Sequence, residues 1–196
     1  MIKVTGGELR GRNLRTPPGL ATRPTAAKVR QAIFNILAGR VAGARAADLY
    51  AGSGALGVEA LSRGATSCVF VEEDRGAARL LMANLAALGL TGQAQVLTAA
   101  VAKAAAGLAA AGPFDLILAD PPYARGQVEA LVGLCAARGL LAPGGVLVIE
   151  HAPAERPAPP CGLALDDRRA YGQTEVSFLS ARQQASPPEA EKGPTA

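Results

Sequence analysis

The chain has 196 residues, 49% of them apolar and 18% charged, which excludes a largely disordered protein and favours a single folded domain. It has no uninterrupted apolar run of about 18 residues and no apolar leader, so we expect a cytoplasmic protein that does not span a membrane. The net charge is +4, and residues 1–45 hold nine basic residues against one acidic residue, which indicates either a polyanionic partner or a solvated basic face.

The first part of the chain predicts a basic arm followed by a helix. We expect residues 1–24 to form a short β-hairpin and a loop, because Gly6-Gly7 marks a turn and Pro24 interrupts regular structure. Thr25 is the expected N-cap of the first helix, and Gly39 ends it. Helical spacing gives this helix a buried face made of Val29, Ile33, Ile36 and Leu37.

Short apolar strands then alternate with helices, which predicts a parallel sheet covered on both faces. We expect strands at 46–49, 68–71, 95–98, 114–119 and 146–150, with two more near 162–165 and 176–179. Helices are expected to begin near Gly54, after Asp74, at Lys103 and near Val128. Residues 25–182 thus form the main domain, and the polar, proline-rich residues 183–196 predict a mobile tail.

A glycine-rich loop follows the first of these strands. Gly52, Gly54 and Gly57 satisfy the G-x-G-x-x-G pattern, in which the glycines permit a tight turn, a close ligand and a close helix–strand contact, in that order. Glu72 ends the next strand 20 residues after Gly52, where a carboxylate can accept hydrogen bonds from ribose hydroxyls. The pattern therefore predicts a cofactor that contains a nucleoside.

The pattern alone fits either a dinucleotide or S-adenosylmethionine. A dinucleotide would place an anionic pyrophosphate at the helix N-terminus, whereas S-adenosylmethionine carries an ammonium and a sulfonium. Asp48, just before the glycines, suits this cationic ligand, although a turn or capping role for Asp48 stays open.

The sharpest motif is Asp120-Pro121-Pro122-Tyr123, which follows the 114–119 strand directly. The two prolines keep the chain extended and can direct a backbone carbonyl into a cleft at the carboxyl end of the sheet. An exocyclic base amine is a poor nucleophile because its lone pair is delocalised. Acceptors on Asp120 and Pro121 could hold its hydrogens and stabilise the developing positive charge, while Tyr123 offers a face for base stacking.

Together the two motifs resemble a class I S-adenosylmethionine-dependent methyltransferase, and more narrowly the RsmD family. The matching segments are residues 7–14, 23–25, 29–30, 34–35, 48–57, 59–65 and 120–123. The resemblance implies a Rossmann-like α/β three-layer sandwich with a seven-stranded, mostly parallel sheet, an antiparallel last strand and an N-terminal β-hairpin extension. It also implies methylation of the N2 amine of one guanine in bacterial 16S ribosomal RNA, in a 30S particle or assembly intermediate, by an enzyme expected to be monomeric.

The resemblance assigns roles to individual positions. The expected cofactor contacts are Asp48, Ala51, Gly52, Ser53, Gly54, Glu72, Ala100 and Asp120, and the amine-binding corner is Asp120, Pro121, Pro122 and Tyr123. One departure concerns adenine, since Thr98-Ala99-Ala100-Val101 offers no acidic or amide side chain after the third strand. The expected RNA contacts are Arg10, Arg12, Arg15, Arg23 and Arg30; Arg30 could instead face the cleft or be simply solvated.

Three alternatives stay open: an adenine-N6 methyltransferase acting on DNA or RNA, a nicotinamide-dependent oxidoreductase, and an inactive RNA-binding protein. Other polar and sulfur-containing residues are expected to be structural. The three scattered cysteines and single histidine predict neither a disulfide framework nor a metal site. We expect Cys68 and Cys135 in the core, His151 at a strand end, and residues 166–169 in a solvated turn.

Overall fold

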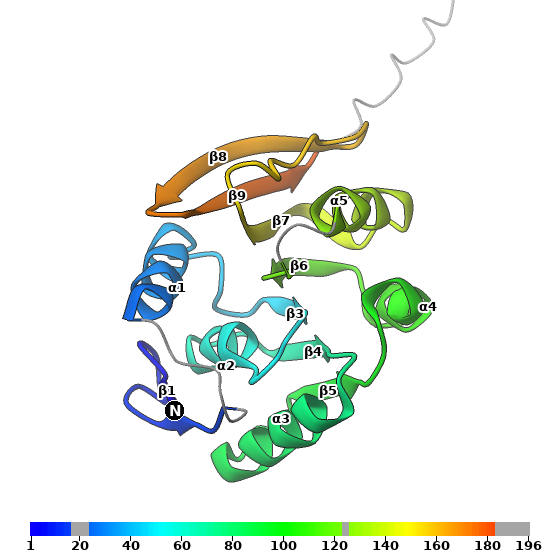
Figure 1. The fold of residues 1–196 in the computed structure, drawn as a ribbon. Helices are drawn as coiled ribbons and strands as arrows, with labels where there is room; N and C mark the ends of the chain where they lie inside the picture. Colours follow the sequence, from blue (N-terminus) through cyan, green and yellow to red (C-terminus); the bar gives the residue numbers. More distant parts are fainter. Residues whose placement is uncertain (17–23, 123–125, 183–196) are drawn as a thin grey trace, which may run out of the picture.

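The computed structural model describes residues 1–16, 24–122 and 126–182 (Figure 1). The predicted site residues Arg23 and Tyr123, and the predicted tail at 183–196, lie outside the described residues. None of the helices within the described ranges is long and apolar enough to cross a bilayer.

Seven strands form one mixed sheet in the order β5-β4-β3-β6-β7-β9-β8. The five strands from β5 to β7 run parallel, and β9 pairs antiparallel with both β7 and β8. The expected seven-stranded sheet with an antiparallel last strand is therefore confirmed. The strands are β3 (Arg45–Leu49), β4 (Ser67–Val71), β5 (Ala94–Leu97), β6 (Phe114–Ala119), β7 (Leu141–His151), β8 (Leu163–Tyr171) and β9 (Thr174–Ala181).

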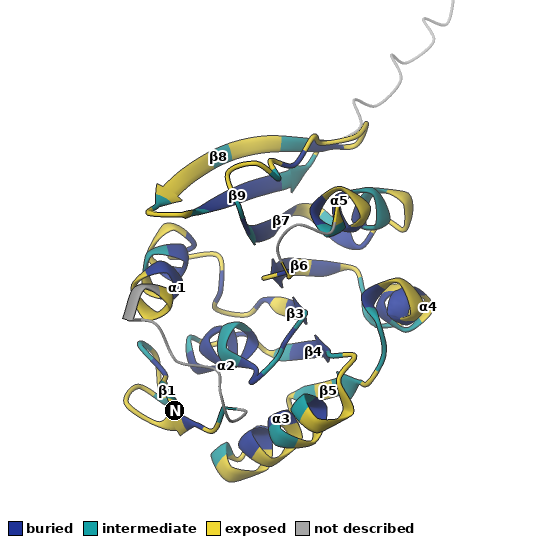
Figure 2. Ribbon diagram, viewed as in Figure 1, coloured by how far each residue is buried: buried dark blue, intermediate teal, exposed yellow. Residues whose placement is uncertain are grey.

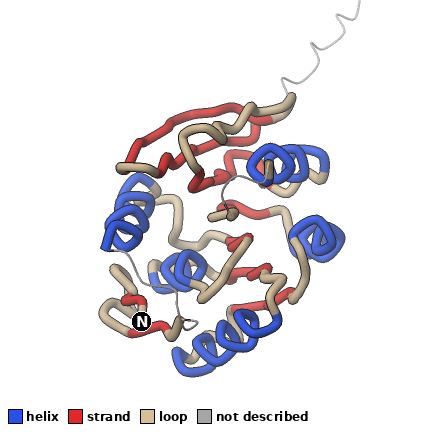
Figure 3. The backbone as a smooth tube through the Cα atoms, in the orientation of Figure 1, coloured by secondary structure: helices blue, strands red, loops and turns tan. Residues whose placement is uncertain are grey.

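Helices cover both faces of the sheet, which gives the expected three layers (Figures 1 and 3). One face carries α1 (Pro24–Ile36), α2 (Ala55–Ser62) and α3 (Arg75–Leu88), and the other carries α4 (Val101–Ala111) and α5 (Gln127–Ala137). Strand residues alternate between two core clusters: Leu116 and Leu118 of β6 pack with α1, α2 and α3, whereas Ile117 packs with α4 and α5. Figure 2 shows the central strands buried between exposed outer helix faces.

The first residues form a small hairpin of β1 (Ile2–Lys3) and β2 (Asn13–Leu14), paired antiparallel. It lies beside α1 and α2 (Figure 1), and the buried side chains of Val4 and Leu14 join the core on that face. The turn of this hairpin requires a glycine at position 7. It has a φ of 74°, and a Cβ there would lie 1.7 Å from the carbonyl oxygen of Ser62, so only glycine fits against the end of α2.

Several sequence expectations differ from the structure near element ends. Helix α1 begins at Pro24 rather than after an N-cap at Thr25, because a proline in the first turn needs no backbone N–H donor. Strand β7 begins at Leu141, with the Pro143-Gly144-Gly145 segment forming an irregularity inside it rather than a preceding turn. Ile36, expected in the core, is 41% exposed at the last turn of α1.

The charged residues 166–169 lie inside β8, so the expected solvated turn is wrong. Because β8 is the last strand in the sheet order, its outer side has no strand neighbour, and charged side chains are common on such edges. The other structural assignments are confirmed: Cys68 and Cys135 are buried and His151 ends β7. His151 Nδ1 donates to the Ala152 carbonyl at 2.8 Å, and Nε2 lies 2.8 Å from the Ser177 hydroxyl.

Candidate cofactor and amine-binding site

The predicted functional residues gather at the carboxyl ends of the parallel strands. The glycine loop follows β3, Glu72 follows β4, Asp120 follows β6, and Glu150 lies near the end of β7. Because the parallel strands all end at one edge of the sheet, these segments meet although they are distant in sequence.

The glycine loop has a backbone that only a few residue types adopt. Tyr50, Gly52 and Gly54 have φ values of 68°, 54° and 84°. A Cβ on Gly57 would lie 2.3 Å from Phe70 Cε1, which confirms that this glycine permits close packing of α2 on β4. A Cβ on Gly54 would lie 2.4 Å from Leu81 Cδ1, whereas one on Gly52 would meet no atom within 4 Å. The open side of the loop is therefore at Gly52.

Asp48 is buried below this loop and holds the start of α2. Its Oδ2 accepts a hydrogen bond of 2.8 Å from the Gly57 backbone N–H, a group that the helix itself leaves unpaired. Burial raises the pKa of Asp48 to about 7, and the bond from Gly57 opposes that rise. Of the two roles left open for Asp48, this contact favours capping.

Glu72 is anchored to the backbone on either side of the loop. Its Oε2 accepts from Gly52 N at 2.7 Å, and its Oε1 accepts from Asp74 N at 2.8 Å. Each carboxylate oxygen can accept a second hydrogen bond. Glu72 therefore stands in a fixed position beside the open loop, with acceptor capacity suited to ribose hydroxyls.

The segment after β5 is as poor in polar side chains as its sequence suggests. Thr98 is exposed, and Ala99 and Ala100 are partly buried. Ala100 is the N-cap of α4 and makes no side-chain capping bond, so the first turn of this helix keeps backbone N–H groups available. A base placed here would meet backbone groups and methyl groups rather than a carboxylate.

The Asp120-Pro121-Pro122 corner begins where β6 ends. Pro121 is buried and Pro122 is exposed, so the chain turns out of the sheet at this point. Asp120 keeps contact with solvent, yet the surrounding protein desolvates its carboxyl group and raises its pKa to about 6.

Glu150 belongs to the same site, and the sequence analysis missed it. Ala119 of β6 is in register with Ile149 of β7, which places Glu150 beside Asp120. Burial raises the pKa of Glu150 to about 8; Asp120 contributes to the rise, and Arg30 opposes it. An acidic residue at the end of an all-apolar strand was a usable signal, since Glu72 follows β4 in the same way.

The arginines predicted to contact RNA divide into exposed and buried side chains. Arg10, Arg12 and Arg15 are exposed on the hairpin and the segment after it. Arg30 is 5% exposed, so its interpretation as a solvated side chain is wrong. Its Nε lies 3.3 Å from Glu59 Oε2, and its Nη2 donates to the Lys3 carbonyl at 2.7 Å.

Glu59 is the centre of a buried network that joins the hairpin to α1 and α2. Its carboxylate accepts from the Thr5 backbone N–H at 2.8 Å and from the Thr5 hydroxyl at 2.7 Å. Arg63 donates to it through Nε at 2.9 Å and lies over the Phe34 ring, 5.1 Å from the centroid. Two arginines therefore surround one buried carboxylate, and Arg63 also contacts an aromatic ring.

A second link connects the arm to the glycine loop. Asn84 of α3 is buried, accepts from Arg15 N at 3.0 Å and donates to Arg15 O at 3.0 Å. The same amide nitrogen donates to the Ser53 carbonyl at 3.1 Å. The Asn84 side chain therefore connects the arm at Arg15 to the glycine loop at Ser53.

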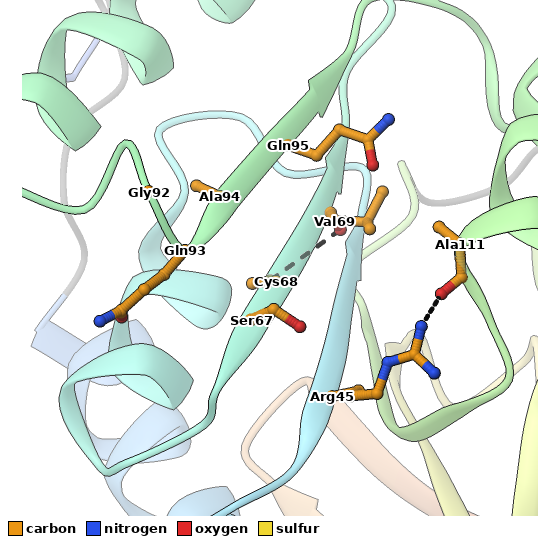
Figure 4. Close-up of a pocket in the computed structure, with 9 residues that line it drawn as sticks. All are labelled: Arg45, Ser67, Cys68, Val69, Gly92, Gln93, Ala94, Gln95 and Ala111. Atoms are coloured by element: carbon orange, nitrogen blue, oxygen red, sulfur yellow. Dashed lines mark hydrogen bonds between the residues drawn. The ribbon is translucent and has the colours of Figure 1, made fainter.

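A cavity of about 320 Å³ lies at the opposite, amino-terminal edge of the sheet (Figure 4). Arg45 reaches across its rim to the Ala111 carbonyl, and Ser67 and Gln95 also line it. Its position at the starts of β3, β4 and β5 separates it from the glycine loop. Across the described ranges, no group of three His, Cys, Asp or Glu side chains is placed to hold a metal ion.

Comparisons with known proteins show the family of the chain and its fold. A family model described as Conserved hypothetical protein 95 matches residues 2–180. The Escherichia coli (strain K12) protein Ribosomal RNA small subunit methyltransferase D is 39% identical over 150 residues, 76% of this chain and 74% of its own. A solved structure of a hypothetical protein from Thermus thermophilus gives a TM-score of 0.78 at 33% identity, covering 92% of this chain and 100% of that one.

The fold extends to more distant proteins. The structure of SMU.776 in complex with SAH, the demethylated product of S-adenosylmethionine, gives a TM-score of 0.63 and covers 82% of this chain and 50% of that one. At 17% identity this likeness concerns the fold alone. With the family match over residues 2–180 and the Escherichia coli relative, the chain belongs to the RsmD family of methyltransferases.

Proposed function

We propose that the protein transfers a methyl group from S-adenosylmethionine to the exocyclic N2 amine of one guanine in 16S ribosomal RNA. The name of the Escherichia coli relative supports ribosomal RNA of the small subunit as the substrate. The observation that carries the proposal is the position of the Asp120-Pro121 corner, which borders the open glycine loop at the same edge of the sheet.

The residues around the loop fit the proposed cofactor. S-adenosylmethionine supplies an activated methyl group on a sulfonium, and this cation suits a loop that has the carboxyl group of Asp48 below it. Glu72 would accept from the ribose hydroxyls, and Ala51, Gly52 and Ser53 would offer loop backbone. The adenine contacts fall to backbone and methyl groups near Ala100, because no acidic side chain follows β5 there.

The corner would activate the amine by holding its hydrogens. The Asp120 carboxylate and the Pro121 carbonyl are acceptors, and together they would direct the nitrogen lone pair away from the base plane. Positive charge develops on the amine during attack, so the negative charge of Asp120 stabilises the transition state more than the ground state. Stacking on Tyr123 remains part of the proposal, and this residue lies outside the described ones.

The hairpin and arm would bind the RNA. Arg10, Arg12 and Arg15 are exposed and can neutralise phosphates, and Arg23 keeps this proposed role outside the described residues. Arg30 is instead assigned to the buried network with Glu59. A stacked and paired base hides its amine, so the target guanine must be unpaired or flipped into the site.

The remaining alternatives differ in the methylated nucleoside that they predict, or predict none. Membership of a methyltransferase family excludes the nicotinamide-dependent oxidoreductase. One assay distinguishes the proposed activity from an adenine-N6 methyltransferase and from an inactive RNA-binding protein. Purified protein is incubated with labelled S-adenosylmethionine and either 30S particles, free 16S RNA or DNA, and the nucleosides are analysed by mass spectrometry. We expect N2-methylguanosine in 16S RNA, with the particle as the preferred substrate and the enzyme acting as a monomer. N6-methyladenosine, or the absence of any product, would contradict the proposal.

A further inference from the structure

Glu150 of β7 lies beside the Asp120 corner that follows β6. Leu118 of β6 and Val148 of β7 are in register and both pack into the core under α1, α2 and α3. Side chains alternate along a strand, so Asp120 and Glu150, two residues further on, project from that same face. Neighbouring parallel strands are about 4.8 Å apart, so the two carboxyl groups line one side of the site together.

The charges that act on Glu150 come from two neighbouring elements of the described structure. Asp120 from β6 and Arg30 from α1 are the charged groups that act on it. Arg30 donates through Nε to Glu59 and through Nη2 to the Lys3 carbonyl. Its positive charge acts on Glu150 from α1 and opposes the effect of the Asp120 charge on the pKa of Glu150.

Guanine presents a pattern that a second carboxylate matches. Its N1–H lies beside the N2 amine, so both point the same way from the base edge as hydrogen-bond donors. Adenine presents an unprotonated N1 beside its N6 amine, which would face a carboxylate as acceptor against acceptor. A base whose amine is held by Asp120 therefore offers its N1 side to a neighbouring group.

We infer that Glu150 is a specificity-determining residue that accepts a hydrogen bond from guanine N1–H while Asp120 and Pro121 hold the N2 amine. This inference rests on the proposed function and adds the basis for choosing guanine over adenine. The nearby charge of Arg30 holds the pKa of Glu150 below the value that burial and Asp120 alone would give it. Binding of an N1–H donor would favour the charged carboxylate further.

The test compares guanine with 2-aminopurine, which keeps the N2 amine but has an acceptor at N1. Once the modified nucleotide is mapped by mass spectrometry, 30S particles are reconstituted with 16S RNA carrying either base at that position. Wild-type protein and Glu150→Gln are assayed for kcat/KM on both, with Glu129→Gln on the exposed side of α5 as the matched control. A hydrogen bond to a charged group predicts a wild-type preference for guanine of roughly 10- to 100-fold.

The amide of Glu150→Gln can donate to the N1 of 2-aminopurine, so this variant should lose most of the preference for guanine. Its activity on 2-aminopurine should equal or exceed that of the wild type, while Glu129→Gln keeps the wild-type preference. An unchanged preference in Glu150→Gln, or equal losses on both bases in a variant that melts like the wild type, would overturn the inference. If the wild type does not methylate guanine, the proposed function itself fails.

Discussion

Arg30 and Glu59 form a buried ion pair, with 3.3 Å between Nε and Oε2 and side-chain exposures of 6% and 0%. The pair joins α1 to α2 beneath the N-terminal hairpin, and its remaining bonds reach Lys3 and Thr5 of that hairpin. The positive charge of Arg30 also lowers the pKa of Glu150. The position of the proposed RNA-binding hairpin is thus tied to the edge where the amine would react.

Loss of the Glu59 charge should destabilise the whole fold. Glu59→Gln leaves the buried Arg30 without its counter-ion, and breaking a buried pair in this way costs about 3–5 kcal/mol. Urea unfolding at neutral pH measures the change in the free energy of unfolding. Glu8→Gln, on the exposed part of the hairpin, is the control and should change it by less than about 0.5 kcal/mol. A loss in Glu59→Gln no larger than in the control would show that the pair does not hold the fold.

Asp120 should matter to chemistry far more than to cofactor binding. Asp120→Ala removes one of the two proposed acceptors for the amine, and losing one such preorganised group typically lowers kcat by about 10²–10³-fold. The dissociation constant for S-adenosylmethionine, measured by calorimetric titration, should change by less than about threefold. Turnover at the wild-type level would remove Asp120 from the mechanism.

The rate of methyl transfer should rise with pH because both carboxyl groups must be charged to act. Burial raises the pKa of Asp120 to about 6 and that of Glu150 to about 8, so protonation disables them as the pH falls through these values. We expect kcat/KM to increase from pH 5.5 to 8.5 in two steps. Glu150→Gln should lose the upper step and retain the lower one; an upper step of unchanged size would assign it to another group.

The same raised pKa predicts an opposite trend for stability. Because Glu150 holds its proton more tightly in the folded state, the stabilisation linked to that proton is complete below about pH 4.5, where a glutamate side chain ordinarily titrates. It is lost as the pH rises through about 8. Glu150→Gln carries no such charge, so its melting temperature should rise relative to the wild type between pH 5 and pH 8.5. Parallel melting curves for the two proteins across this range would contradict the assignment.

The exposed arginines should set the salt dependence of RNA binding. Changing Arg10 and Arg12 to Gln should weaken binding to 16S RNA, and each lost phosphate contact should reduce the slope of log K against log salt by about 0.7–0.9. Arg138→Gln, at the end of α5 on the opposite helix layer, is the control and should leave the slope unchanged. If the slope of log K against log salt is the same in the Arg10 and Arg12 variant as in Arg138→Gln, these two arginines do not contact the RNA.

Local signals predicted individual elements well. Strand β6 has the bounds that its apolar run indicates, and α3 has both of its expected ends, with the Asp74 side chain accepting from Ala77 N and Gly89 in a left-handed conformation. The G-x-G-x-x-G loop and the Asp-Pro-Pro corner also meet where strand order requires. The contacts that determine β6 and the ends of α3 are local, whereas the loop and the corner meet through the order of the strands.

Contacts between distant segments were beyond local signals. Pro143-Gly144-Gly145 predicts a turn, and only pairing of Leu141 with Phe114 shows that the strand has already begun. Arg30 is buried because Glu59 and Lys3 meet it from other elements. Glu150 becomes part of the site only once β7 is known to lie beside β6. Each of these depends on strand order or helix packing that the sequence pattern does not specify.

A crystal structure with bound S-adenosylmethionine would test the central claim most directly, through the distance from its methyl carbon to the Asp120 carboxylate and the Pro121 carbonyl. The account predicts a methyl group that faces the gap between these two acceptors, with enough room for one base amine. A donor that lies away from the glycine loop, or whose methyl carbon points away from the corner, would contradict it.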